Sequence, residues 1–433
     1  MSEQATSNRL VSLDVFRGMT IAGMVLVNNP GTWSAIYAPL EHAPWHGITP
    51  TDYIFPFFLF IVGTAIPIAL GKRIAEGISK QVYLKIIQRA LMIFGLGLFM
   101  AAFPLINMTE SNIPMIAKFA AMLMLMAAVY FWLIDKNREA VGAFILTSVL
   151  LSGFYLAGYT LFFNNFATLR IPGVLQRIAV CYAVVSILFL HTNWKQLTVI
   201  SIVLLLLYWL LMTVVPVPGC EITTIDDKGC NFAAYLDRLI LTESHIWKSS
   251  KIFDPEGFLS TLPAIVTTIS GVLTGTWLKS ERSDTEKAGG MFFFGVVLCA
   301  AGWCWNFFFP FNKSLWTSSY VVYTSGLALC FLGFCFWLID IKGYKKWTKP
   351  FVIFGMNALA LFVFSGLLAK VMGIIKVGEI DGKPLSLQQW IFNNIFLSIA
   401  APINASLAFA VSFILFWLFL MWLLYRKRIY IKV

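Results

Sequence analysis

The stretch QLTVISIVLLLLYWLLMTVV, residues 196–215, contains no charged side chain, and its apolar residues do not alternate with polar ones as in a β-strand. About 20 such residues make a helix long enough to cross a lipid bilayer, where the backbone must satisfy its hydrogen bonds internally. The rest of the chain has the same character, since 59% of its 433 residues are hydrophobic and only 12% are charged. Soluble domains carry about a quarter charged residues. The sequence therefore predicts an all-α polytopic membrane protein.

Twelve apolar runs predict twelve transmembrane helices, because each is about as long as a bilayer requires. They lie near residues 11–29, 52–70, 86–105, 116–134, 140–162, 172–190, 196–215, 258–278, 289–309, 315–339, 350–374 and 403–425. A further stretch at 387–399 is too short to span easily, and we expect an interfacial or re-entrant helix there. We detect no convincing internal repeat, which weakly disfavours transporters built from repeated halves.

Lysine and arginine indicate which connections face the cytoplasm. They concentrate in alternate connections, namely 71–89, 135–139, 191–195, 279–287, 340–349 and the C-terminal tail. The remaining connections are poorer in these residues for their length: 30–51, 106–115, 163–169, 216–257, 310–314 and 375–402. By the positive-inside rule, the first set and both termini are predicted to be cytoplasmic, and the second set external. This distribution accounts for the net charge of +11 without a nucleic-acid partner.

The seven cysteines fall into two groups. Five lie in apolar runs, where a thiol is usually a small hydrophobic group: Cys181, Cys299, Cys304, Cys330 and Cys335. Cys220 and Cys230 instead lie ten residues apart in the long connection 216–257. They could be free thiols or a disulfide, and the predicted external location favours the disulfide, which needs an oxidising compartment.

Polar side chains at membrane depth are candidates for a functional site, because they are costly to bury there. Asp14 and Arg17 lie three apart on the first run, where they could form a local ion pair or belong to a site. Both lie inside an apolar run without a small-residue cleavage site, so this run predicts a retained helix rather than a signal peptide. Asn28, at the outer end of the same run, could cap the helix or orient a ligand. Asn357 lies about two turns into the run 350–374.

Arg177 follows Gln176 in the segment RIPGVLQRIAV and lies inside an apolar run. A guanidinium there needs a carboxylate or an anionic ligand. The external carboxylates available to it are Asp52, Asp254 and Glu256. Lys313 and Trp316 mark the outer start of the run 315–339, and we interpret them as a snorkelling lysine and an interfacial tryptophan.

Half of the four histidines stand in the segment EHAPWHG, at His42 and His46. Their spacing would suit a metal on a helix, but Pro44 and Gly47 disfavour a helix here, and we predict no metal. A single neutral imidazole is suited to general base catalysis near neutral pH. The residues alone leave two alternatives for each histidine, a general base or an ordinary loop side chain. The chain has no P-loop, GxSxG or HExxH motif.

Eight stretches together resemble the heparan-α-glucosaminide N-acetyltransferase family of transmembrane acetyltransferases, in that family's order. They are SLDVFRGMTIAGMVLVNN, EHAPWHGITPTDYIFPFFLFIVG, LRIPGVLQRIAV, PVPGC, AAYLDRLIL, FDPEG, NKSLWTSSYV and GMNALAL, which cover most of the chain from residue 11 to about 365. The resemblance implies transfer of an acetyl group from cytoplasmic acetyl-CoA to the amine of a glucosamine residue across a membrane. It also implies that the histidine of the His-Ala-x-Trp-x-Gly motif, His42, is catalytic. His46 occupies the variable position of that motif.

On this resemblance, the remaining polar residues are assigned expected roles. His42 acts as general base or acetyl carrier, with Asp52 beside it and Asn28 as an oxyanion donor. The expected cofactor-binding residues are Asp14, Arg17, Gln176, Arg177 and Asn357. The expected substrate-binding residues are Trp45, Asp254, Glu256 and Trp316.

Two departures from the family shape the remaining expectations. Residues 107–168 are extra and read as a two-helix insertion, for packing, a lid or a contact in a homodimer. The chain also starts at the LDVFRG helix, which suggests a bacterial inner-membrane protein whose acceptor is an amino sugar other than heparan. Two other functions stay open: a sugar permease, and an O-acyltransferase acting on an envelope polysaccharide.

Overall fold

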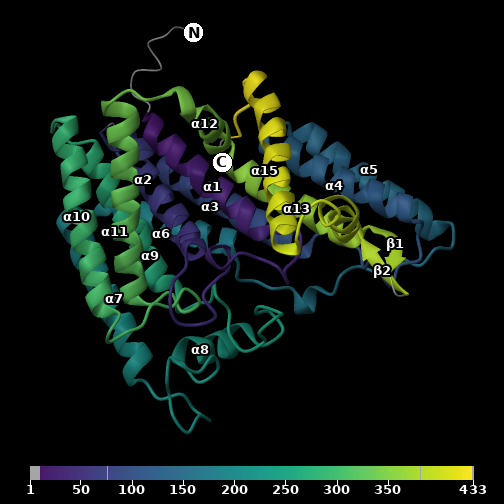
Figure 1. Ribbon diagram of the computed structural model, residues 1–433, viewed down its shortest axis with the longest axis horizontal. Helices are drawn as coiled ribbons and strands as arrows, with labels where there is room; N and C mark the ends of the chain where they lie inside the picture. Colours follow the sequence, from purple (N-terminus) through teal and green to yellow (C-terminus); the bar gives the residue numbers. More distant parts are fainter. Residues whose placement is uncertain (1–9, 76, 381, 432–433) are drawn as a thin grey trace. The chain divides into compact units, whose positions relative to one another are not determined.

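The computed structural model describes residues 10–75, 77–380 and 382–431 (Figure 1). Within these residues, eleven helices are long and apolar enough to cross a membrane, or twelve if one bent pair counts as a single span. The prediction of an all-α polytopic membrane protein is confirmed for the described part of the chain, apart from one short β-hairpin. The chain packs as two compact units, which we describe separately.

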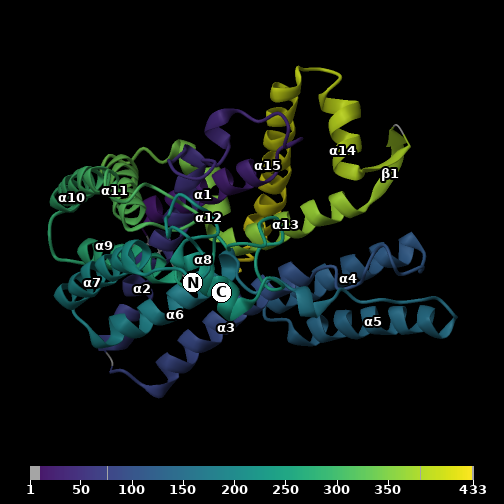
Figure 2. The ribbon, with the colours of Figure 1, turned by 90° about the horizontal axis from the view of Figure 1, so that it is seen from below.

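The first unit comprises Met1–Thr20, Glu41–Leu98 and Thr168–Val352. Its helices are α2 (Ile54–Ala75), α6 (Val174–His191), α7 (Trp194–Val214), α8 (Phe232–Leu241), α9 (Thr261–Leu278), α10 (Asp284–Trp305) and α11 (Ser318–Cys335). Three further helices have residues in both units: α1 (Val11–Asn28), α3 (Lys80–Ala102) and α12 (Lys349–Met356). Figures 1 and 2 both show α10 and α11 side by side along their lengths.

Glycines bring α2 against α9 at the centre of this unit. A Cβ added at Gly63 would lie 1.9 Å from the carbonyl oxygen of Thr268, and one at Gly271 would lie 2.0 Å from that of Phe60. Small residues therefore allow the two backbones to approach closely, as is common between helices in membranes. The start of α2 is also tied to α11, because the Tyr320 hydroxyl donates a 2.6 Å hydrogen bond to the carbonyl oxygen of Asp52.

The second unit comprises Ile21–Leu40, Phe99–Ala167 and Ile353–Val433. Its elements are α4 (Met115–Leu133), α5 (Asn137–Leu156), α13 (Ala358–Ile374), β1 (Lys376–Ile380), β2 (Lys383–Ser386), α14 (Leu387–Ile391), a π-helical turn (Phe392–Phe396) and α15 (Pro402–Arg426). The segment expected as an insertion, 107–168, holds α4 and α5, which lie side by side as an antiparallel pair (Figure 2).

Two sequence-based expectations need correction in this unit. The prediction of one continuous helix over 350–374 is wrong, because the chain breaks at Asn357 between α12 and α13 with a bend of 70°. The buried Asn357 amide binds the C-terminal segment instead: its oxygen accepts from the Ile431 N–H at 2.8 Å and its nitrogen donates to the Ile429 carbonyl. Asparagine side chains that bond backbone groups compete with helix continuation. The connection 375–402, expected to hold only a short helix, also contains the β1–β2 hairpin.

Candidate active site around His42

A short 3₁₀ turn at Pro50–Tyr53, directly before α2, positions Asp52. Thr49 caps this turn, and its backbone N–H and hydroxyl both donate to Asp52 Oδ2, at 3.0 and 3.1 Å. The Ala43 N–H donates to the same oxygen at 3.1 Å. The sequence Thr-Pro-Thr-Asp suits this geometry, because proline fits a first helical position and an acidic residue at the third completes the cap. The carboxylate is only 1% exposed, and these donors satisfy the oxygen that faces the loop.

His42 binds the other oxygen of the same carboxylate. Its Nδ1 lies 2.7 Å from Asp52 Oδ1, so the ring donates its Nδ1–H to a carboxylate that is already oriented by three other donors. A histidine held in this way has its lone pair at Nε2, the tautomer of a general base. The His42 side chain is 50% exposed, so a reactant can reach it. The loop thus places a half-exposed base on a buried anion.

Lys313, in the connection between α10 and α11, completes this cluster. Its Nζ lies 3.0 Å from His42 Nδ1, 3.1 Å from His42 Nε2 and 3.7 Å from Asp52 Oδ1. Burial lowers the pKa of Lys313, against the raising effect of the Asp52 and Glu256 carboxylates. Sequence reasoning missed this residue by interpreting it as a snorkelling lysine. Its position could have indicated a functional role, because it is a lysine in a connection otherwise poor in basic residues and lies within the motif NKSLW.

The other histidine of the segment faces a different carboxylate. His46 Nε2 lies 2.8 Å from Asp226 Oδ1, and the neighbouring Trp45 donates its indole N–H to the Ile225 carbonyl at 2.9 Å. Both partners lie between Cys220 and Cys230, whose sulfur atoms are 1.99 Å apart in a disulfide bond. The two histidines of the segment therefore bind different carboxylates, and the disulfide-closed loop binds the segment through Trp45 and His46.

The carboxylates Asp254 and Glu256, which the sequence predicts to be external, are engaged by Arg170 rather than by Arg177. Arg170 donates two hydrogen bonds to Asp254, at 2.9 and 2.6 Å, and a third to Glu256. Although burial acts to lower the pKa of Arg170, these carboxylates raise it above its ordinary value. Asp254 is 2% exposed, so this pairing neutralises a buried charge and leaves its carboxylate little capacity for a sugar.

Arg177 itself lies buried beneath Trp316. Its Nη2 donates to the Gly257 carbonyl at 3.1 Å and to the Ser260 hydroxyl, and its guanidinium lies 5.2 Å from the indole ring of Trp316. Among the described residues, its Nε and Nη1 have no hydrogen-bond partner, and no carboxylate lies within ion-pair distance. Trp316 is 1% exposed and donates its indole N–H to the Thr267 hydroxyl on α9, which fixes its ring against Arg177.

The remaining expected residues are distributed over both units. Asp14 and Arg17 form an ion pair of 3.3 Å on α1, and the Gln176 amide packs against the backbones of Gly97 and Gly173. Asn28, in the second unit, is exposed at the end of α1, whereas its neighbour Asn29 is buried and donates to the Val25 carbonyl.

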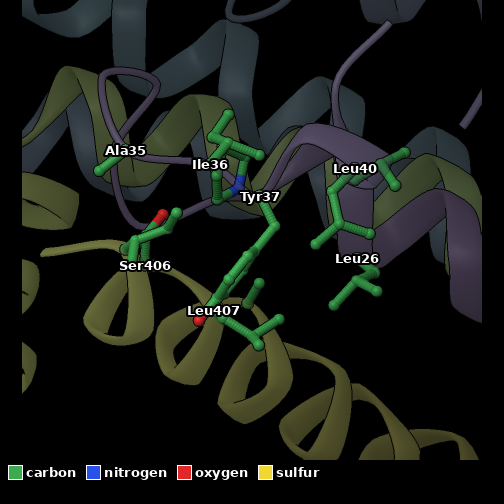
Figure 3. Close-up of a pocket in the computed structure, with 11 residues that line it drawn as sticks. Leu26, Ala35, Ile36, Tyr37, Leu40, Ser406 and Leu407 are labelled. Carbon is green, nitrogen blue, oxygen red and sulfur yellow. The ribbon is translucent and has the colours of Figure 1, made fainter. Parts of the chain in front are cut away.

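The second unit also has a small pocket formed by the end of α1, the loop after it and α15 (Figure 3). Its lining is almost entirely apolar, with Leu26, Ile36, Leu40 and Leu407 around the Tyr37 ring. It presents no acid or base, so we place no chemistry there.

Residues 9–227, just over half of the chain, match the model of a family described as a domain of unknown function, DUF5009. The chain belongs to the DUF5009 family. The part matched to DUF5009 contains the His42 loop, the Asp52 turn and the disulfide-closed loop up to Asp226.

Two curated relatives of this DUF5009 protein carry a name that states an activity. The mouse (Mus musculus) heparan-alpha-glucosaminide N-acetyltransferase is 25% identical over 422 residues, covering 84% of this chain and 54% of the relative. The human (Homo sapiens) protein of the same name is 26% identical over 414 residues, covering 82% and 52%. The chain thus spans about half the length of the curated relatives it matches. The resemblance found in the sequence motifs is confirmed.

Proposed function

We propose that this protein is a transmembrane N-acetyltransferase. It transfers the acetyl group of cytoplasmic acetyl-CoA to the amine of a glucosamine-type sugar at the opposite membrane face. The observation that carries the proposal is the His42–Asp52 pair, a half-exposed imidazole whose Nδ1 is 2.7 Å from a buried carboxylate. The names of the two relatives support the reaction class. The protein is expected in a bacterial inner membrane with both termini cytoplasmic.

In the direct route, His42 acts as a general base. The neutral sugar amine attacks the thioester carbonyl, and Nε2 takes the proton that the amine loses as the C–N bond forms. The C–S bond then breaks, and the thiolate of CoA takes that proton from Nε2, which returns His42 to its neutral form. Asp52 stabilises the imidazolium that forms in between, as a carboxylate does in a catalytic triad. In the alternative route, Nε2 itself attacks the carbonyl, expels the thiolate and passes the acetyl group to the amine.

The cationic residues differ in how well they suit the phosphates of CoA. Arg17 lies near the predicted cytoplasmic end of α1, and we assign it, with its partner Asp14, to the phosphate end of the donor site. Arg177 contacts Gly257 and Ser260, which follow the predicted external loop. We therefore assign Arg177, whose Nε and Nη1 have no hydrogen-bond partner among the residues that the structure describes, to an anionic group near the acceptor side.

An acceptor screen tests the proposal. Purified protein in detergent or nanodiscs receives acetyl-CoA and a panel of amino sugars, and free thiol and acetylated product are measured. We expect thiol release and an amide product from the wild type, and loss of both in His42→Ala. His46→Ala is the matched control, because it removes the neighbouring imidazole from the same loop, and it should retain activity. An ester product would indicate an O-acyltransferase. Absence of thiol release with any amino sugar, together with sugar accumulation in vesicles, would indicate a permease.

A further inference from the structure

The position of the Lys313 ammonium relative to the His42 ring is unusual. Its Nζ is almost equidistant from Nδ1 and Nε2, at 3.0 and 3.1 Å. A point in the ring plane at these two distances would overlap Cε1, so the ammonium must lie over the face of the ring. The lone pair of Nε2 lies in the ring plane and is therefore not covered by Lys313. The ammonium and the Nε2 lone pair therefore do not occupy the same position.

The ion pair between Lys313 and Asp52 does not by itself account for this position. Nζ is 3.7 Å from Asp52 Oδ1, farther than from either ring nitrogen, and that carboxylate already accepts hydrogen bonds from Ala43, Thr49 and His42. Snorkelling does not account for it either, because the Lys313 side chain is only 21% exposed. The charged groups around it are the carboxylates Asp52 and Glu256, and His42 is the neighbouring titratable group.

The loop that carries Lys313 is built to hold it in place. The Asn312 N–H donates to the Thr317 hydroxyl at 3.1 Å, and the Thr317 N–H donates to the Asn312 carbonyl at 3.2 Å, which closes the loop on either side of the lysine. Trp316, in the same loop, is buried with a positive φ of 55°. A preorganised donor is what stabilisation of a developing negative charge requires, because no reorganisation is then needed during the reaction.

We infer that Lys313 is a catalytic residue that donates a hydrogen bond to the acetyl carbonyl oxygen while His42 acts at the same carbonyl. The inference rests on the proposed acetyltransferase function. As the new bond to the carbonyl carbon forms, its π-electrons move to oxygen, and the ammonium about 3 Å from Nε2 stabilises that oxyanion. When the C–S bond breaks, the electrons return to the carbonyl and the ammonium keeps its protons. Lys313 is neither acetylated nor deprotonated in this cycle, and it takes the role that the sequence suggested for Asn28.

The test compares Lys313→Met and Lys313→Arg with wild type, under the acceptor conditions described above. We expect kcat to fall about 10²–10³-fold in Lys313→Met with KM changed only a few-fold, the size of effect seen when one oxyanion donor is removed. Lys313→Arg should recover part of kcat. Binding of a non-reactive thioether analogue of acetyl-CoA should be unchanged in both, because the charge is needed only in the transition state. Lys195→Met is the control, since that exposed lysine lies over the Trp194 ring at the start of α7.

Chemical rescue distinguishes loss of the Lys313 ammonium from a folding defect. Lys313→Cys should be inactive and should regain activity when 2-bromoethylamine converts the cysteine to an aminoethyl analogue of lysine, with wild type treated identically. The inference is overturned if Lys313→Met keeps kcat within about threefold of wild type while His42→Ala is inactive, or if peptide mass spectrometry finds acetyl on Lys313 during turnover. If the wild type acetylates no acceptor, the proposed acetyltransferase function itself fails. That outcome differs from failure of the Lys313 inference alone, in which the wild type is active and Lys313→Met remains active.

Discussion

Replacing Asp52 with asparagine should strongly lower kcat, because it changes which ring nitrogen of His42 carries the proton. Oδ2 of Asp52 faces three donors, the N–H groups of Ala43 and Thr49 and the Thr49 hydroxyl. An asparagine must place its amide oxygen there, because its NH₂ group would otherwise point at two backbone N–H groups. The NH₂ then occupies the position of Oδ1, 2.7 Å from His42 Nδ1. A donor at that position forces Nδ1 to accept, so the ring proton moves to Nε2 and the lone pair needed for catalysis is lost.

The structure sets the size of two separate effects of this change. The same exchange in a serine-protease triad lowers kcat about 10⁴-fold, and we expect a loss of about 10³–10⁴ here, or about 4–5.5 kcal/mol of transition-state stabilisation. Stability should suffer less, because the amide oxygen still accepts three hydrogen bonds. Only the charge is lost, which is expected to lower the free energy of unfolding by about 1–3 kcal/mol.

The chain supplies a matched control in its second histidine–carboxylate pair. Asp226→Asn makes the identical change beside His46, 2.8 Å from its Nε2, on a side chain that is 74% exposed. Thiol release from acetyl-CoA and thermal unfolding are measured for both variants. We expect Asp226→Asn to stay within about threefold of wild type in kcat, since an exposed pair is worth about 1 kcal/mol or less. The reasoning is refuted if Asp52→Asn keeps more than a tenth of the wild-type kcat, or if both variants lose activity equally.

Three further predictions follow from the same region. Because burial lowers the pKa of Lys313, its ammonium loses a proton at a lower pH than that of a free lysine. The fall of kcat at alkaline pH should therefore move to higher pH in Lys313→Arg. A pH profile of kcat identical to that of the wild type would show that Lys313 does not cause this fall. Replacing Cys220 and Cys230 with serine removes a cross-link between residues ten positions apart. This should lower the free energy of unfolding by about 2–3 kcal/mol in denaturation assays. An unchanged unfolding midpoint would show that the loop is rigid without the disulfide. Burial, assisted by Asp254, raises the pKa of Asp237 from 3.8 to about 7, so the folded state holds a proton that the unfolded state releases. Wild-type stability should therefore fall between about pH 4 and 7, by at most about 1.4 kcal/mol per pH unit, and equal pH dependence in Asp237→Asn would contradict this.

The local and global predictions from sequence differ in how far they succeeded. The apolar runs predicted the membrane helices to within a few residues at most ends, and residues 107–168 contain two helices as expected. The partner of Arg177 could not be inferred. The sequence offered Asp52, Asp254 and Glu256 to Arg177, whereas packing pairs Asp254 and Glu256 with Arg170. The break at Asn357 was missed because its cause is a hydrogen bond to residues 429–431, far along the chain.

By itself, the sequence determined that this is a helical membrane protein, since bilayer thickness sets the length of an apolar run and no water is available to the backbone within it. It also singled out His42 through a local motif, although which of two histidines could act was not decided by spacing. Only the tertiary structure decided what surrounds that histidine. Asp52 is ten residues away and Lys313 is 271 residues away, and they meet at one imidazole because close helix packing brings the start of α2 to the start of α11. A site formed by such distant segments depends on packing geometry, which no local pattern contains.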